Sequence, residues 1–169
     1  MNAAFPSPTQ PRHTRTEVFV GYLDYYRAVV LEKLEGLAVE ELRSSWLPSG
    51  WTPLELLKHL TYVERRWLVW GFEGQVVDDP WGDNRDDRWH VGPEEGFADL
   101  VREFRAQAAV SRAVVEGHEL SEIGQPSARW DGADPPTLER ILFHLLQEYA
   151  RHAGHLDIVR ELIDSDTGE

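Results

Sequence analysis

The chain has 169 residues, of which 41% are hydrophobic and 11% aromatic, a composition typical of one globular domain with its own core. Its 30 acidic and 17 basic residues give a net charge of −13, which argues against binding to nucleic acids and to anionic membranes. Because the chain has no cysteine, disulfides, thiolate metal sites and a cysteine nucleophile are excluded, and any metal must be bound by His, Asp or Glu.

The N-terminal residues 1–14 are rich in proline and poor in apolar side chains, and we predict a flexible arm there. This segment has no apolar core long enough for a signal peptide, and no stretch approaches the roughly 20 apolar residues of a membrane helix. We therefore expect a cytoplasmic protein. A single helical domain is predicted over residues 15–164, followed by a polar tail over 165–169.

Two helices are predicted in the first half of the chain. In residues 16–36, apolar side chains recur mostly at spacings of three and four, as on one face of a helix. After a break rich in Pro, Ser and Gly, a second helix is predicted over residues 53–72. Thr52 can cap it, Pro53 suits its first position, and Glu55 stands three residues after the cap, as in a capping box.

Residues 73–93 contain glycines, prolines and acids without a helical period, and we predict a long loop there. A loop of this length in a compact domain is often functional. Its tryptophans, Trp81 and Trp89, indicate that the loop packs against the body of the protein. The same two side chains are candidates for lining the entrance to a site.

The second half of the chain is predicted to add two more helices. A third helix is predicted over residues 94–117, and a second irregular connection over 118–136. The last helix is predicted to begin at the Thr137 cap and to end near residue 163. Four long helices without convincing strands predict an all-α four-helix bundle with long connections after helices two and three.

The last predicted helix carries polar residues on its apolar face. At about 100° per residue, Glu148 and His152 lie about 40° apart, and His155 lies about 20° to the other side of Glu148. All three side chains therefore point toward the core. A buried carboxylate without a partner is costly or takes up a proton. A metal ion is the simplest group that satisfies Glu148 and His152 together.

A third ligand is expected from a facing helix. His59 is the only histidine of the second predicted helix and shares a helical face with leucines and a valine. His59, Glu148 and His152 supply two imidazoles and one carboxylate, which is the composition of catalytic zinc sites, although nickel and non-haem iron are also compatible. The alternative is that Glu148 pairs with Arg151 or another basic residue, and that His152 is a hydrogen-bonded core histidine.

Other polar residues of the two helices are predicted to be structural. His144 lies toward the edge of the inner face and is expected to pack there. Asp157 faces away from Glu148, and a salt bridge to Arg160 is its predicted use. Glu64 and Arg66 are predicted to be solvated or to form surface pairs.

Two segments, GWTPLELLKHLTYVERRW and HLLQEYARHAGHLDIVREL, resemble signature segments of the DinB-like superfamily of metal-binding four-helix bundles. The resemblance covers residues 15–163 and points to the actinobacterial branch related to mycothiol-dependent maleylpyruvate isomerases. In those isomerases a histidine, a glutamate and a second histidine bind zinc, and these roles fall on His59, Glu148 and His152. The chain does not show the additional C-terminal domain of the isomerases, so maleylpyruvate itself is not the expected substrate.

The resemblance implies metal-dependent transfer or isomerisation that uses a low-molecular-weight thiol, mycothiol or a similar compound, on a small electrophile. A divalent metal, most simply zinc, lowers the pKa of a coordinated thiol so that a thiolate exists at neutral pH. His155 is expected near the metal, as a catalytic acid or base, as a hydrogen-bond donor in the pocket, or as a partner of a ligand.

Two other function classes remain open from the sequence. The first is a non-catalytic metal-binding or dimeric interaction protein, for which the metal would be structural. The second is a metal-dependent hydrolase, which needs a general base near the metal, and His155 is the obvious candidate. Whichever function holds, a homodimer is expected, because bundles that resemble this one commonly dimerise.

Overall fold

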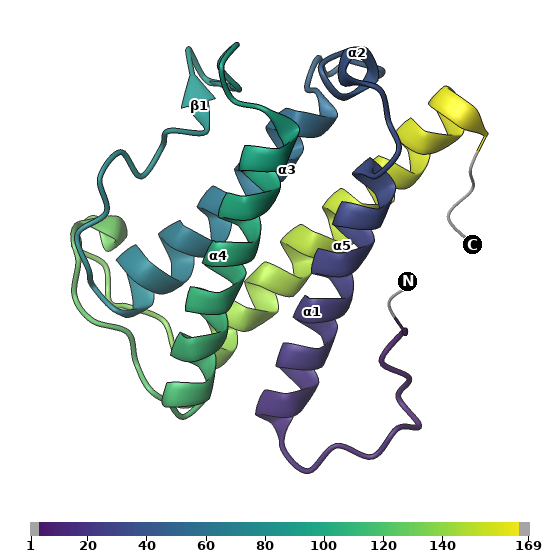
Figure 1. The fold of residues 1–169 in the computed structure, drawn as a ribbon. Helices are drawn as coiled ribbons and strands as arrows, with labels where there is room; N and C mark the ends of the chain where they lie inside the picture. The colour runs from purple at the N-terminus through teal and green to yellow at the C-terminus, as the bar shows by residue number, and fades with distance from the viewer. Residues whose placement is uncertain (1–3, 166–169) are drawn as a thin grey trace.

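The computed structural model describes residues 4–165 and is a bundle of four long helical segments (Figure 1). α1 (Arg15–Leu34) packs along α5 (Leu138–Asp164), and α3 (Pro53–Glu64) packs against α4 (Phe97–Gly117). Contacts between α3 and α5 join the two pairs. The prediction of an all-α four-helix bundle is confirmed.

The second helical segment has two parts with different winding. α3 begins as predicted, because the Thr52 hydroxyl accepts a hydrogen bond from the Glu55 N–H and the Glu55 carboxylate accepts one from the Thr52 N–H. From Arg65 the chain continues as a π-helix, η1 (Arg65–Phe72), whose hydrogen bonds join residue i to residue i+5. The wider turns rotate the side chains of η1 relative to a continuous α-helix, which the apolar periodicity did not predict.

The long connections are present as predicted, but they contain short ordered elements. Between η1 and α4, β1 (Asn84–Arg85) and β2 (Arg88–Trp89) pair as an antiparallel hairpin whose turn is formed by two aspartates with positive φ. The expectation of a loop without strands is therefore wrong at this point. The connection between α4 and α5 contains a 3₁₀ turn, η2 (Ala128–Trp130), and a short helix, α2 (Val39–Leu42), precedes α3.

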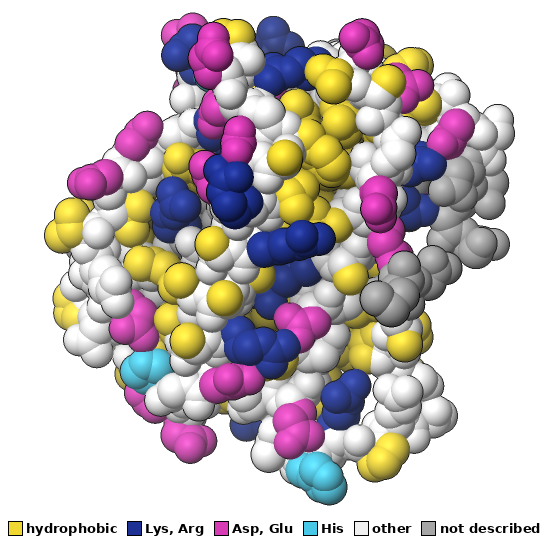
Figure 2. Space-filling view, viewed as in Figure 1, with side chains coloured by type: hydrophobic (Ala, Val, Ile, Leu, Met, Phe, Trp, Pro, Cys, Tyr) yellow, Lys and Arg dark blue, Asp and Glu magenta, His cyan; other side chains and the backbone are white. Residues whose placement is uncertain are grey.

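Apolar side chains from all four helical segments form one hydrophobic core. Its largest fully buried members include Leu23, Leu56, Phe104 and Tyr149. On the face shown in Figure 2, hydrophobic side chains gather between the upper parts of α1 and α4, with basic and acidic side chains interspersed around them. Within residues 4–165, none of the helices is both long and apolar enough to cross a membrane.

An aromatic side chain of the segment before α1 packs against the bundle. Phe5 packs edge-on against Tyr22 and Tyr25, with ring centroids 5.9 and 5.3 Å apart. The flexible arm over residues 1–14 stays a prediction. Residues 1–3 of that arm and residues 166–169 of the polar tail lie outside the described part of the chain.

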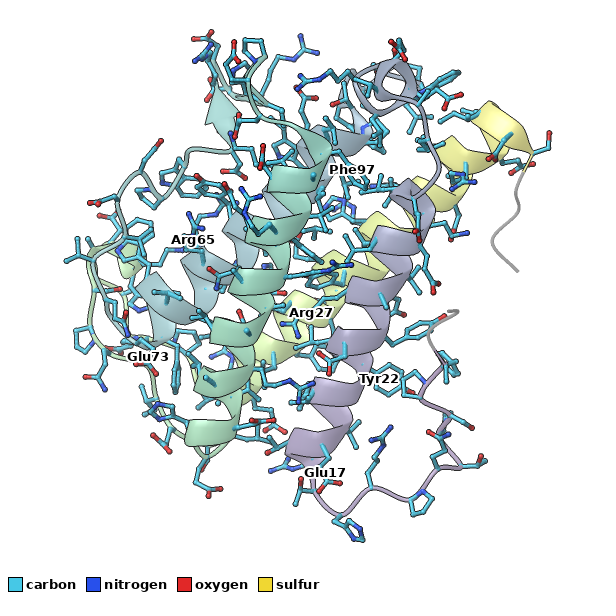
Figure 3. The ribbon with its side chains drawn as sticks, in the orientation of Figure 1. Glu17, Tyr22, Arg27, Arg65, Glu73 and Phe97 are labelled. Carbon is cyan, nitrogen blue, oxygen red and sulfur yellow. The ribbon has the colours of Figure 1, made fainter. Side chains whose placement is uncertain are left out.

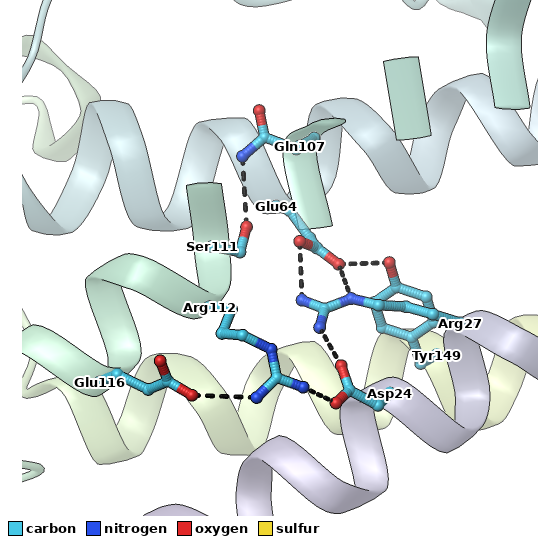
Figure 4. A network of polar contacts seen from close by, with 8 residues as sticks. All are labelled: Asp24, Arg27, Glu64, Gln107, Ser111, Arg112, Glu116 and Tyr149. Atoms are coloured by element: carbon cyan, nitrogen blue, oxygen red, sulfur yellow. Dashed lines mark hydrogen bonds and ion pairs between the residues drawn. The ribbon is translucent and has the colours of Figure 1, made fainter. Parts of the chain in front are cut away.

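A network of buried charges lies inside the bundle, where the sequence predicted none. Arg27 points from α1 toward the space between α1 and α4 (Figure 3). Its Nε and Nη2 donate hydrogen bonds to the two carboxylate oxygens of Glu64, at 2.8 and 2.9 Å. The Tyr149 hydroxyl donates to the same carboxylate (Figure 4). Because Glu64 is only 1% exposed, the prediction that it is solvated or at the surface is wrong.

The network extends from the core to the surface through further ion pairs. Asp24 accepts hydrogen bonds from both Arg27 and Arg112, and Arg112 also binds Glu116. Burial alone would lower the pKa of Arg27, but Glu64, Tyr149 and Asp24 together outweigh burial and raise it. Every charged group of this network therefore has a partner of opposite charge within the protein.

The contact between α1 and α5 also decides the partner of Asp157. Lys33 of α1 lies 2.9 Å from the Asp157 carboxylate. The predicted partner, Arg160, instead binds Asp164 at 2.6 Å and the Lys33 carbonyl at 2.9 Å. The prediction failed because a spacing within one helix does not reveal a lysine on the neighbouring helix.

Candidate metal centre

His59 of α3 and Glu148 and His152 of α5 meet where the two helices pack together. One potential ligand atom from each residue lies within 4.8 Å of the others. The His152 Nε2 is 3.2 Å from a Glu148 carboxylate oxygen, and the His59 Nε2 is 3.9 Å from the same oxygen. The structure therefore brings together the three residues that the sequence selected as metal ligands.

The three side chains differ in their exposure to solvent. The His152 and His59 side chains are 7% and 14% exposed, whereas the Glu148 side chain is 25% exposed. The cluster is therefore closed on its histidine side and open on its glutamate side. A catalytic metal site needs such an open side for water or substrate, whereas a structural site is closed by protein ligands.

The Glu148 carboxylate is surrounded by imidazoles and has no cationic side chain as its partner. Besides His59 and His152, the His144 Nε2 lies 3.5 Å from its second oxygen. Within residues 4–165, none of the described ion pairs joins Glu148 to a lysine or arginine, and Arg151 is exposed. Hydrogen bonds from His152 and His59 hold the pKa of Glu148 well below its ordinary value. An ionised carboxylate among imidazoles is a donor set that fits a divalent metal.

Asp83, in the connection between η1 and α4, fixes the orientation of His59. Its carboxylate lies 3.0 Å from the His59 Nδ1 and is only 2% exposed. Burial alone would raise the pKa of Asp83, but hydrogen bonds from His59 and Arg66 outweigh burial and lower it. Because an ionised carboxylate can only accept hydrogen bonds, the His59 Nδ1 carries the proton. The other ring nitrogen, His59 Nε2, faces Glu148 and is the one that would bind a metal ion.

Arg66 in turn holds Asp83 in place, which the sequence did not predict. Its two terminal nitrogens lie 2.6 and 3.0 Å from the two carboxylate oxygens of Asp83. Arg66 is only 4% exposed, so the prediction of a solvated side chain is wrong. Arg66 stands seven residues after His59, and residues seven apart lie on one side of a helix. This spacing was the sequence signal that could have placed Arg66 on the same side as His59. Asp83 gave no comparable signal, because it is one of several acids in an aperiodic segment.

His155 contacts a proposed metal ligand and does not belong to the cluster of ligand atoms. Its Nδ1 lies 3.3 Å from the His152 Nδ1. Burial, with the nearby His152 and Arg151, lowers the pKa of His155. A neutral His155 can therefore accept a hydrogen bond from His152 and fix the orientation of that ring. The catalytic role of His155 stays a prediction.

The hairpin covers one side of the cluster through Trp89. Its ring stacks on the His59 ring with centroids 4.1 Å apart, and it lies 5.3 Å from the His152 ring. The prediction that this connection packs against the body is confirmed at Trp89. Trp89 and Trp51 also line a cavity of about 670 Å³, together with polar residues of the hairpin. The cavity therefore begins beside Trp89, which contacts two of the proposed ligands.

This chain is a DinB-like bundle, with four long helical segments and a His/Glu/His cluster between the second and the last of them. A family model described as Mycothiol-S-transferase matches residues 18–165 of this chain. Because the match covers most of the sequence, the chain belongs to the mycothiol-S-transferase family. The resemblance deduced from the two signature segments is confirmed. No curated protein matches the chain.

Proposed function

We propose that the protein transfers mycothiol, or a closely similar thiol, to a small electrophile, and that His59, Glu148 and His152 bind the divalent metal that the reaction needs. The observation that carries this proposal is the ionised Glu148 carboxylate, which faces three imidazoles and solvent but no basic side chain of the described residues. Membership in the mycothiol-S-transferase family supports the choice of thiol. Zinc is the first metal to test, because it suits this donor set.

When bound, a divalent metal supplies Lewis acidity that keeps a thiol deprotonated at neutral pH. Since the chain has no cysteine, the nucleophilic sulfur belongs to the thiol substrate. In the transfer, a bond forms between this sulfur and the electrophilic carbon while the bond from that carbon to its leaving group breaks. The leaving group takes the electron pair, and the thiol proton is released.

The residues around the cluster have distinct tasks in this proposal. Asp83 and the stacked Trp89 keep the His59 Nε2 directed at the centre. The contact between the Nδ1 atoms of His155 and His152 orients the His152 ring, so that its Nε2, which faces Glu148, would be the nitrogen that binds the metal. The exposed side of Glu148 leaves room for the thiol and the electrophile to approach.

The metal content of the untagged protein tests the site. Elemental mass spectrometry is expected to find about one zinc or other divalent ion per chain in the wild type. His152→Ala is expected to lose it, whereas His13→Ala, which changes an exposed histidine ahead of α1, is expected to keep it. Absence of metal from the wild type, even after reconstitution, would contradict the proposed metal site.

The reaction is tested with the metal-loaded protein, mycothiol and a chromogenic aryl chloride. We expect chloride displacement that depends on mycothiol and is lost in His152→Ala. Bound metal without any transfer would favour a non-catalytic metal-binding protein. Ester hydrolysis without a thiol would favour a metal-dependent hydrolase.

We also infer a homodimer in the cytoplasm, as expected for this family of bundles. Large hydrophobic side chains of α5 are exposed in the single chain, namely Phe143, Ile158 and Leu162. Light scattering of the purified protein measures the mass in solution. A mass equal to that of one chain at micromolar concentration would contradict the homodimer.

A further inference from the structure

One arginine beside the proposed metal centre has no acidic partner. Arg129 lies in η2, and its guanidinium carbon lies 4.6 Å from the Trp67 ring centroid, 5.6 Å from that of Trp130 and 6.0 Å from that of Trp81. Its Nε is buried without a hydrogen-bond partner. Among the interactions described for residues 4–165, no ion pair or hydrogen bond involves the Arg129 guanidinium.

The absence of an acidic partner is notable in a chain with 30 acidic and 17 basic residues. A second guanidinium in this region, that of Arg66, is balanced by both carboxylate oxygens of Asp83. Burial and the positive charge of Arg66 both lower the pKa of Arg129. The surroundings of Arg129 therefore disfavour its charge, and an anion bound there would offset this cost.

Arg129 is linked to the proposed metal centre through Trp67 and His144. The Trp67 ring beneath it lies 4.2 Å from the His144 ring, and the His144 Nε2 lies 3.5 Å from a Glu148 oxygen. The side chains of His144 and Glu148 are 36% and 25% exposed, more than those of His59 and His152. The edge of Glu148 that faces His144 is therefore the side of the cluster that lies toward Arg129.

The position of Arg129 is fixed by close contacts between η2 and η1. A Cβ at Gly71 would lie 2.9 Å from the Trp130 ring, so this indole packs directly on the η1 backbone. The Gln125 N–H donates to the Phe72 carbonyl at 2.7 Å, and the Trp130 Nε1 donates to the Gln125 carbonyl at 3.2 Å. Because the guanidinium is held in advance, little ordering is needed when it binds a ligand.

We propose that Arg129 binds a carboxylate group of the electrophilic substrate, and that this substrate is therefore a small organic acid. This inference rests on the proposed function and adds the chemical class of the electrophile. A guanidinium offers paired N–H donors that match the two oxygens of a carboxylate. The indole rings cover part of the guanidinium, and reduced contact with water strengthens the attraction between charges.

A matched pair of electrophiles tests the specificity of the zinc-loaded, full-length protein with mycothiol. Chlorodinitrobenzoate and its methyl ester undergo the same displacement of chloride by sulfur, so the ratio of their kcat/KM values isolates the effect of the carboxylate. Arg129→Gln is expected to lower this ratio about tenfold or more, and Arg129→Lys to lower it less. Arg105→Gln, which removes the same charge from an exposed position on α4, is expected to leave the ratio unchanged.

A binding measurement tests the site independently of activity. In the zinc-loaded wild type, benzoate is expected to shift the indole N–H resonances of Trp67 and Trp130 saturably, whereas benzamide is expected to leave them in place. Arg129→Gln should lose the benzoate response. A benzoate response that depends on Arg129 would support the inference even if the protein consumed neither electrophile. Failure to consume either electrophile would contradict the proposed function but not the anion site at Arg129. An unchanged selectivity ratio and benzoate response in a folded Arg129→Gln protein would overturn the inference and leave Arg129 as a packing residue on Trp67.

Discussion

Glu64 and Glu148 are both carboxylates that a helix directs into the bundle, but their surroundings differ. Glu64 is 1% exposed and binds the Arg27 guanidinium and the Tyr149 hydroxyl (Figure 4). The Glu148 side chain is 25% exposed and faces imidazoles without a basic partner among the described residues. The more deeply buried carboxylate is therefore the one that the protein neutralises itself. Charge balance, more than burial, distinguishes the structural carboxylate from the candidate functional one.

The same two helices supply both regions. On α3, Glu64 follows the proposed ligand His59 by five residues, and on α5, Tyr149 directly follows Glu148. Neighbouring residues of a helix point about 100° apart, so one helix can serve two clusters on different sides. This arrangement allows each cluster to be changed while the other is kept, which makes the comparison testable by substitution.

The largest expected effect is the loss of Glu64. In Glu64→Ala, Arg27 stays buried without its carboxylate, and truncation of one partner of a buried ion pair costs about 3–5 kcal/mol. Urea unfolding of the metal-free protein measures this loss in the free energy of unfolding. Glu148→Ala is the matched control and should lose less, because the Glu148 side chain is partly exposed and its truncation leaves no buried arginine without a partner. Equal losses in the two variants would remove the distinction drawn above.

The second effect is stabilisation by metal. Zinc at about one hundred times its dissociation constant is expected to raise the free energy of unfolding of the wild type by about 2.7 kcal/mol. This increment should vanish in Glu148→Ala and persist in Glu64→Gln, because only the former loses a proposed ligand. Unfolding with and without zinc measures it in each protein. An increment that survives in Glu148→Ala would place the metal elsewhere.

A smaller effect is expected from the residue that orients His59. Asp83→Asn weakens the acceptor for the His59 Nδ1 proton, and such a change near a metal ligand typically costs about 10–100-fold in metal affinity. Competition with a chelator measures this affinity. Asp157→Asn serves as the control, because it removes an ion-paired aspartate that binds Lys33 away from the cluster. Equal affinities in Asp83→Asn and the wild type would show that Asp83 has no influence on the metal.

The smallest expected effect concerns His118, whose neighbours are carboxylates. His118 lies 2.8 Å from Glu122 and 2.9 Å from Glu73, and the hydrogen bond to Glu122 is the main cause that raises the pKa of His118. The pKa values of His144 and His155 near the proposed metal are instead lowered, mainly by burial. The raised pKa means that protonated His118 stabilises the fold.

The sign of the pH dependence follows from this raised pKa. The stabilisation is complete below the unfolded-state pKa, which is about 6.5, and is lost as the pH rises through the higher folded-state pKa. The difference in the free energy of unfolding between the wild type and His118→Gln should thus be roughly a few tenths of a kcal/mol near pH 6. It should disappear in alkaline solution. Thermal unfolding across this range measures it. A difference that grows with pH would contradict the assignment.

The sequence predicted most of the fold because the fold depends largely on local patterns. Apolar spacing located the four long helices, and the capping box at Thr52 located the start of α3. Helical geometry placed Glu148 and His152 on the inner face of α5. These features depend on residues that lie within one or two helical turns of each other.

The sequence did not predict features that depend on distant partners. Glu64 is buried because Arg27 lies opposite, 37 residues earlier in the chain, and no local pattern reveals that pairing. Asp83 reaches His59 through an aperiodic connection, so its position depends on tertiary packing. The π-helical winding of η1 likewise broke the regular period that the prediction assumed.

The contact between Asp83 and His59 joins the connection between η1 and α4 energetically to the proposed metal centre. Thermodynamic reciprocity then applies to any molecule that binds this connection and displaces Asp83. Such a molecule must change the affinity for the metal by the same factor by which the metal changes the affinity for that molecule. A ligand that binds the hairpin and displaces the adjacent Asp83 would thus change the retention of the metal without touching the ion.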